Sequence, residues 1–145
     1  MAEPRPTMSD AELAIKLYDL RREAVMRESR TAINSKFWPK TFEDVVAVVS
    51  RPEDPLNAPF RQVSSYWEMV YGMARHGITH ADYLMENNGE GLFLFAKLRP
   101  HLERFRKEYS PLAFQNAEWV ATQSSEGRRR FEFFSARVQK MLATK

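Results

Sequence analysis

The sequence predicts an all-α fold, and its spacing and composition both favour this class. Apolar residues recur at helical intervals along most of the chain, and no stretch sustains the alternation of apolar and polar residues that is typical of strands. Only 5 of the 145 residues are glycine, while 43% are hydrophobic and 28% are charged. This balance is typical of a globular chain that can bury a core. We therefore expect a single domain of about six or seven helices, arranged as an irregular bundle around a central apolar helix.

The composition also excludes several classes of protein. The chain contains no cysteine, which excludes disulfide scaffolds, thiolate zinc sites, iron–sulfur clusters and cysteine nucleophiles. No apolar run approaches the roughly 20 residues that span a bilayer, and residues 1–6 lack the apolar stretch of a signal peptide. We therefore expect a soluble, cytoplasmic protein, with residues 1–8 as a flexible N-terminal lead and residues 9–145 as the helical domain.

Two helices are predicted in the first part of the domain. Ser9 and Glu12 have the spacing of a capping box, and the helix that they start extends to about Ala32. A second, shorter helix begins near Thr41. The run Val45–Val49 is the best strand candidate on composition, but a lone short strand would have no partner, so we favour a helix there.

The most apolar helix is predicted over Phe60–His76, after a loop at residues 51–59 that contains three prolines. Gly77 is placed to end this helix in the left-handed conformation. The apolar residues extend well beyond half of its circumference, which is typical of a central helix or a subunit contact. Its main stripe consists of Phe60, Val63, Trp67, Val70 and Ala74.

The remaining helices are predicted from caps and prolines. A helix over Gly91–Lys107 should be kinked or divided at Pro100, because proline cannot donate within a helix. The other helices are expected to start at Thr79, at Pro111, and at Ser124 or Ser125.

The middle of the chain resembles a known family. Tyr66-Trp67-Glu68-Met69 leads through Arg75-His76-Gly77-Ile78 into a short helix, and Phe95-Ala96-Lys97-Leu98-Arg99-Pro100 then runs toward Arg104 and Arg106. This order is similar to that of a family of short helical bacterial domains of unknown function. The resemblance extends over roughly residues 60–106. It implies a helical fold and a bacterial source, and it implies no reaction.

Charge is distributed unevenly between the two parts of the chain. Residues 1–96 contain 11 basic and 14 acidic side chains, whereas residues 97–145 contain 11 basic and 5 acidic ones. The basic residues that could form a patch are Lys97, Arg104, Lys107, Arg128, Arg129 and Arg130. Such a patch could bind nucleic acid or another anionic surface. We favour the alternative that these residues are solvated or form salt bridges.

A polar seam is predicted along the apolar helix. Arg61, Ser65, Glu68 and Arg75 follow one another at helical spacing, with Gly72 between the last two. Glu68 could be a pocket carboxylate whose pKa is raised by burial and which acts as a general acid or base. We favour the alternative of a carboxylate paired with an arginine from another helix, since no second acid or nucleophile accompanies it.

The sequence predicts no metal site, no cofactor and no catalytic residue. His76 and His80 have the spacing of two ligands on one helix, but Gly77 interrupts that helix. We expect a non-enzymatic protein that acts through protein–protein contact, most simply by self-association as a homo-oligomer, because the chain has more large apolar side chains than it can easily bury. The alternatives are a binder of nucleic acid or anionic surfaces through residues 97–145, and a ligand or enzymatic pocket around Glu68.

Overall fold

The computed structural model describes residues 4–145, and all of its regular secondary structure is helical. The described part contains α1 (Met8–Arg21), α2 (Ala24–Lys36), α3 (Phe42–Val49), α4 (Asn57–Arg75), α5 (Ala81–Asn87), α6 (Gly91–Leu98), the 3-10 helix η1 (Arg99–His101), α7 (Leu102–Glu108), α8 (Gln115–Gln123) and α9 (Ser125–Ala143). The predicted all-α class is therefore confirmed. Residues 1–3 of the predicted lead lie outside the described residues.

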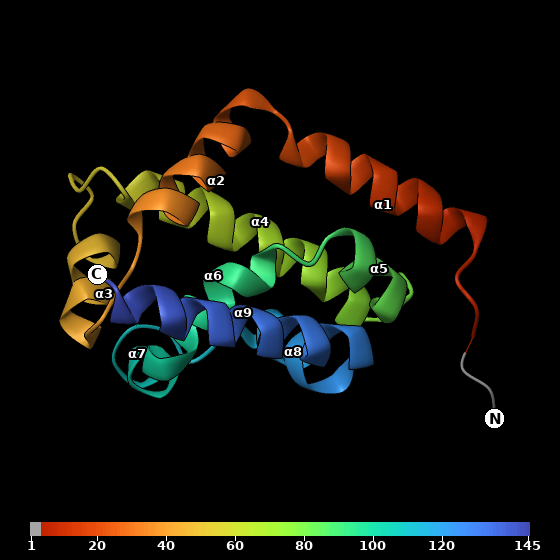
Figure 1. Cartoon of the computed structure of the whole chain (residues 1–145). Helices are drawn as coiled ribbons and strands as arrows, with labels where there is room; N and C mark the ends of the chain where they lie inside the picture. Colours follow the sequence, from red (N-terminus) through yellow and green to blue (C-terminus); the bar gives the residue numbers. More distant parts are fainter. Residues whose placement is uncertain (1–3) are drawn as a thin grey trace.

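The helices form layers around α4. One side of α4 packs on α2 and another on α8, while α9 lies farther out against α6, α8 and α5 (Figure 1). The helices α1 and α2 make a bent arm along one edge, and α1 touches the rest of the domain mainly through α5 and α2 (Figure 1). The predicted last helix, α9, therefore packs mainly on α6, α8 and α5.

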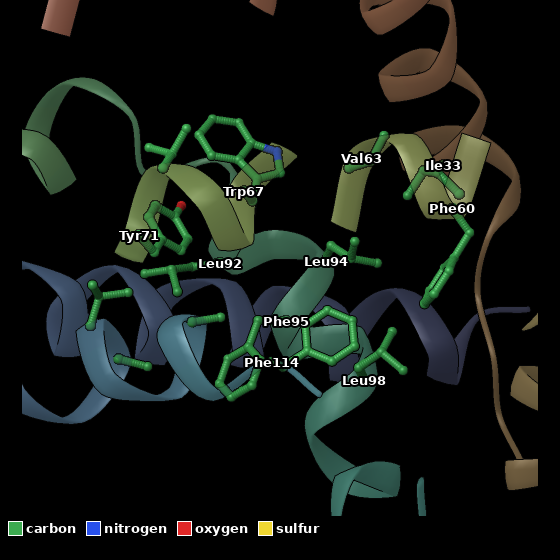
Figure 2. Packing of buried hydrophobic residues seen from close by; sticks show 14 of the residues in the cluster. Ile33, Phe60, Val63, Trp67, Tyr71, Leu92, Leu94, Phe95, Leu98 and Phe114 are labelled. Atoms are coloured by element: carbon green, nitrogen blue, oxygen red, sulfur yellow. The ribbon is translucent and has the colours of Figure 1, made fainter. Parts of the chain in front are cut away.

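The core is continuous between α4, α6 and α8. Figure 2 shows Tyr71 of α4 beside Leu92 of α6, and Phe95 of α6 beside Phe114, which directly precedes α8. Trp67 of α4 belongs to the same buried cluster. The close approach of α6 to α4 depends on Gly91. A Cβ atom on that residue would lie 2.6 Å from Cγ of Trp67 and 2.7 Å from the Tyr71 hydroxyl, so a larger residue would push the two helices apart.

Three predicted helix ends agree with the structure. Thr41 and Asp44 form a capping box, so the valine-rich run is a helix and not a strand. Gly77 has φ +71° at the end of α4. The Ser124 hydroxyl accepts a hydrogen bond from the Gly127 amide at 3.0 Å and thereby caps α9.

The predicted first helix is wrong in two respects. Its capping box is Thr7 with Asp10, so the helix begins at Met8 and not after Ser9. It also ends at Arg21, because Glu23 leaves the helical conformation, with φ −56° and ψ 145°, and its carboxylate accepts the amides of Val25 and Met26 in the first turn of α2. Glutamate is a weak sequence signal for a cap, so the break gives no clear pattern. This break and the division of Gly91–Lys107 at η1 explain why the structure contains more helices than predicted.

Three other predicted starts differ from those in the structure. The loop at residues 51–59 is shorter than predicted, since α4 already begins at Asn57 and Pro59 lies in its first turn, where an amide is not needed. The cap of α5 is His80 and not Thr79, whose hydroxyl instead donates to Asp10 at 2.9 Å. The helix predicted from Pro111 begins only at Gln115.

Candidate functional site

Glu68 is a helix cap between two elements. Its Oε1 accepts the Ala117 amide at 2.8 Å and its Oε2 accepts the Asn116 amide at 3.1 Å, both in the first turn of α8. Burial raises the pKa of Glu68, and the two amides oppose that rise. The predicted arginine partner is replaced by the N-terminus of α8, which is also electropositive. Sequence reasoning missed this role because the two helices are far apart in the chain.

The other residues of the predicted polar seam lie in two different places. Arg61 and Ser65 line the same open groove as Glu68, with a volume of about 570 Å³, whereas Arg75 donates to Asn116 at 3.1 Å. The walls of the groove include Phe60, Phe105, Leu112 and Phe114. The Ser65 hydroxyl donates to the backbone carbonyl of Arg61, so no base activates it. The arrangement offers an apolar floor for binding.

The predicted basic patch is wrong for Lys97, which lies in the interior. Its side chain is 2% exposed, and its Nζ donates to the Ile33 carbonyl at 3.0 Å and to the Asn34 carbonyl at 3.4 Å, at the end of α2. The same ammonium lies 3.9 Å from the ring centre of Trp38 and 4.6 Å from that of Phe93. The only sequence signal is that this lysine is the one charged residue of Gly91–Leu98.

The remaining basic residues do not share one surface. Arg104 on α7 pairs with Glu108 at 2.5 Å, while Arg129 pairs with Glu126 at 3.3 Å at the start of α9. The helix η1, which adjoins α7, lies beside residues 135–142 in the second half of α9. Arg104 of α7 is therefore near the C-terminal end of α9, whereas the arginines at 128–130 are near its N-terminal end. Lys107 and Arg128 are exposed.

A cavity of about 470 Å³ lies between η1 and the second half of α9, and Lys97 contributes to its wall. Three further basic residues line it: Lys40, Arg99 and His101. Burial, with a smaller effect from the charge of Lys145, lowers the pKa of Lys97 to about 7. This basic cavity joins residues from three separate parts of the chain, so sequence spacing does not predict it.

Glu90 forms a second cluster that the sequence did not predict. Its carboxylate accepts two hydrogen bonds from Arg30, at 2.9 and 2.5 Å, and one each from Arg21 and Asn34 at 3.2 Å. Burial raises the pKa of Glu90, but the hydrogen bonds and charge of Arg30 outweigh it, so the pKa falls below its ordinary value. The cluster ties α1 and α2 to the start of α6, although the buried Nε of Arg21 has no hydrogen-bond partner among the described residues.

Comparison with known proteins identifies the family. The family described as a domain of unknown function, DUF4760, matches residues 6–124. The chain belongs to the DUF4760 family. The family resemblance inferred from the sequence is thereby confirmed, and the DUF4760 match includes α1–α8, with Glu68, Glu90 and Lys97, whereas α9 follows it. No curated protein and no solved structure matches the chain.

Two features are absent from residues 4–145 of this DUF4760 chain. None of the helices described there combines the length and apolar character that crossing a membrane requires. Over the same residues, no group of three or more His, Asp or Glu side chains is placed to hold a metal ion. His80, one of the two histidines considered as ligands, instead accepts the Tyr83 amide at Nδ1, 3.1 Å away.

Proposed function

We propose that this chain is a non-enzymatic interaction module that associates with a second copy of itself through the outer face of α1. The observation that carries the proposal is a stripe of exposed apolar side chains. Met8 is 75% exposed, Ile15 is 70% exposed and Tyr18 is 44% exposed, and their spacing puts them on one side of the helix.

The helix α1 has apolar residues on two sides, and its own domain covers only one of them. Ala14 and Leu17 face inward and are buried. A surface helix of a monomer ordinarily shows one apolar face and one polar face, so a second apolar stripe favours a partner. Tyr18 also favours a partner, because tyrosine is a residue type that is enriched at protein–protein interfaces.

The charges beside the stripe favour a second copy as the partner. Glu12 and Arg22 are both exposed and belong to no salt bridge among the described residues. An antiparallel pair of α1 helices centred near Leu17 would bring Glu12 of one copy close to Arg22 of the other, twice by symmetry. Two-fold symmetry of this kind is the commonest arrangement in soluble homo-oligomers.

Light scattering tests the proposal on the full chain at a concentration of tens of micromolar. We expect a mass of about twice 17.0 kDa for the wild type. The double variant Ile15→Glu, Tyr18→Glu should be monomeric, because it places charges in the contact. The matched control is Leu112→Glu, which changes an equally exposed apolar residue outside α1 and should stay dimeric. A monomeric wild type, or a dimer that persists in a folded double variant, would refute the proposal.

A further inference from the structure

We propose that the cavity between η1 and the second half of α9 is a binding site for a small organic anion, a molecule with a carboxylate or phosphate group on an apolar body. This site goes beyond the proposed self-association, since none of its lining residues belongs to α1. Its volume of about 470 Å³ lies within the range of ordinary small-molecule sites.

The charge of the cavity wall identifies the anionic part of the ligand. Lys40, Lys97, Arg99 and His101 line it, and among the residues that the structure describes no carboxylate does so. Neither the two lysines nor the arginine forms a salt bridge with a side chain of residues 4–145. Lys40 donates to the main-chain oxygen of Lys145, the last residue of the sequence. His101 adds no charge near neutral pH, because burial lowers its pKa despite the opposing effect of Asp44 and Glu43. Convergent lysine and arginine side chains are an arrangement that recognises carboxylate and phosphate groups.

The rest of the wall identifies the apolar part of the ligand. Six of the twelve lining residues are apolar: Pro39, Ala96, Pro100, Phe131, Val138 and Leu142. Ser135 and Gln139 of α9 add two neutral polar side chains. A few convergent polar groups within an apolar wall are typical of sites for small organic molecules, and they distinguish this cavity from a solvated basic surface.

Lys97 provides a second observation that favours an anionic ligand. It is almost wholly buried, and its ammonium is held by two carbonyl groups and two aromatic rings, with no carboxylate. A buried charge without a full counter-charge is unfavourable, and the lowered pKa of Lys97 reflects that cost of burial. An anion in the cavity supplies the counter-charge through space and leaves the carbonyl contacts intact.

Calorimetric titration of the full chain tests the site with four probes: hexanoate, hexyl phosphate, the neutral hexanamide and inorganic phosphate. We expect at least one of the first two to bind, and hexanamide to bind about tenfold more weakly or not at all, because it lacks the charge. Hexanoate against hexyl phosphate distinguishes carboxylate from phosphate ligands. Inorganic phosphate should bind more weakly than hexyl phosphate, because it lacks the apolar body.

Variants place the binding in this cavity. Arg99→Gln removes an exposed cation of the wall without disturbing the core, and it should weaken binding about tenfold. The single variant Lys97→Met should weaken binding more than Arg99→Gln does. The matched control is Arg137→Gln, an exposed arginine of α9 that does not line the cavity, and it should bind as the wild type does.

Three results would overturn the inference: no binding of either hexyl anion at millimolar concentration, equal binding of hexanamide, or unchanged affinity in Arg99→Gln. If Lys97→Met fails to fold, Arg99→Gln with its control still decides the matter. The oligomeric state of the Ile15→Glu, Tyr18→Glu variant is a separate readout, so failure of this site and failure of self-association are distinguishable.

Discussion

Lys97 is a buried cation that is stabilised by partial charges. The carbonyls of Ile33 and Asn34 belong to the last turn of α2, where the helix dipole is negative, and the faces of Trp38 and Phe93 add cation–π attraction. These contacts join α2, the following turn and α6 at one point. They do not restore the ordinary pKa, because desolvation is the larger effect.

The free energy of unfolding should depend on pH through Lys97. The pKa of Lys97 is about 7 in the folded chain and 10.5 as its ordinary value, so the unfolded chain binds more protons between these values. Stability should therefore rise by about 2 kcal/mol from pH 7.5 to pH 9.5. Urea unfolding at both pH values measures this change. The window stays below the titration of Tyr66, whose pKa burial raises to about 12.

Lys97→Met is the control for that prediction. Methionine has similar length and no charge, so the variant should show a much flatter dependence of stability on pH over the same window. An equal slope in both proteins would assign the pH effect to another group and show that Lys97 is hydrated in the folded chain.

Trp67 is buried against Gly91, Tyr66 and Tyr71. Trp67→Ala should lower the free energy of unfolding by about 3–5 kcal/mol, because it opens a large cavity between α4 and α6. Thermal unfolding measures the loss. Met69→Ala is the matched control, since Met69 is on the same helix but exposed, and it should unfold near the wild-type temperature.

At the scale of elements, α8 depends on a side chain from α4 for its start. Phe114, the residue before α8, is left-handed with φ 58°, and it provides no side-chain cap. The Glu68 carboxylate accepts hydrogen bonds from the amides of Asn116 and Ala117, which have no partner within the first turn of α8. A conventional cap within the segment is thus replaced by a contact between helices.

Glu68→Ala should therefore destabilise the domain by about 1–2 kcal/mol through the loss of this cap, and Glu68→Gln should cost less, because one oxygen can still accept. Urea unfolding of the two variants measures the difference. Glu86→Gln, at an exposed glutamate of α5, serves as the control and should leave stability unchanged. Equal stability of Glu68→Ala and the wild type would show that water caps α8 equally well.

At the scale of the whole molecule, the excess of basic residues after residue 96 does not produce one surface. Lys97 is internal, Arg104 pairs with Glu108 and Glu43, and Arg129 pairs with Glu126. Arg106 donates to Glu118 at 3.0 Å and joins α7 to α8. The net charge of a segment therefore says little about the field at any one face.

The corresponding prediction is that the Arg128→Gln, Arg129→Gln, Arg130→Gln triple variant binds RNA or DNA no differently from the wild type. Retention should be near background for both at about 150 mM salt, where exposed charges are screened. Filter binding over a salt series measures it. Micromolar wild-type affinity with a steep salt slope that the triple variant flattens would support the nucleic-acid alternative.

The sequence by itself determined the helical class and the ends that depend on neighbouring residues. The capping box at Thr41, the left-handed Gly77, the break at Pro100 and the Ser124 cap are all local, because the groups involved lie within about one turn of each other. The predicted seam also brought Arg61, Ser65 and Glu68 to one groove, since residues three or four apart share a helix face.

Only the tertiary structure decided where the remaining polar groups find partners. Asp10 of α1 accepts a hydrogen bond from the Thr79 hydroxyl, and Glu68 of α4 accepts the Ala117 amide at the start of α8. Lys97 of α6 donates to the Ile33 carbonyl at the end of α2, beside the cavity under α9. Each of these partners is more than 45 residues away in the chain, and spacing along one helix carries no information about them. The physical reason is that a buried polar group must be satisfied by whatever the packed fold brings near it.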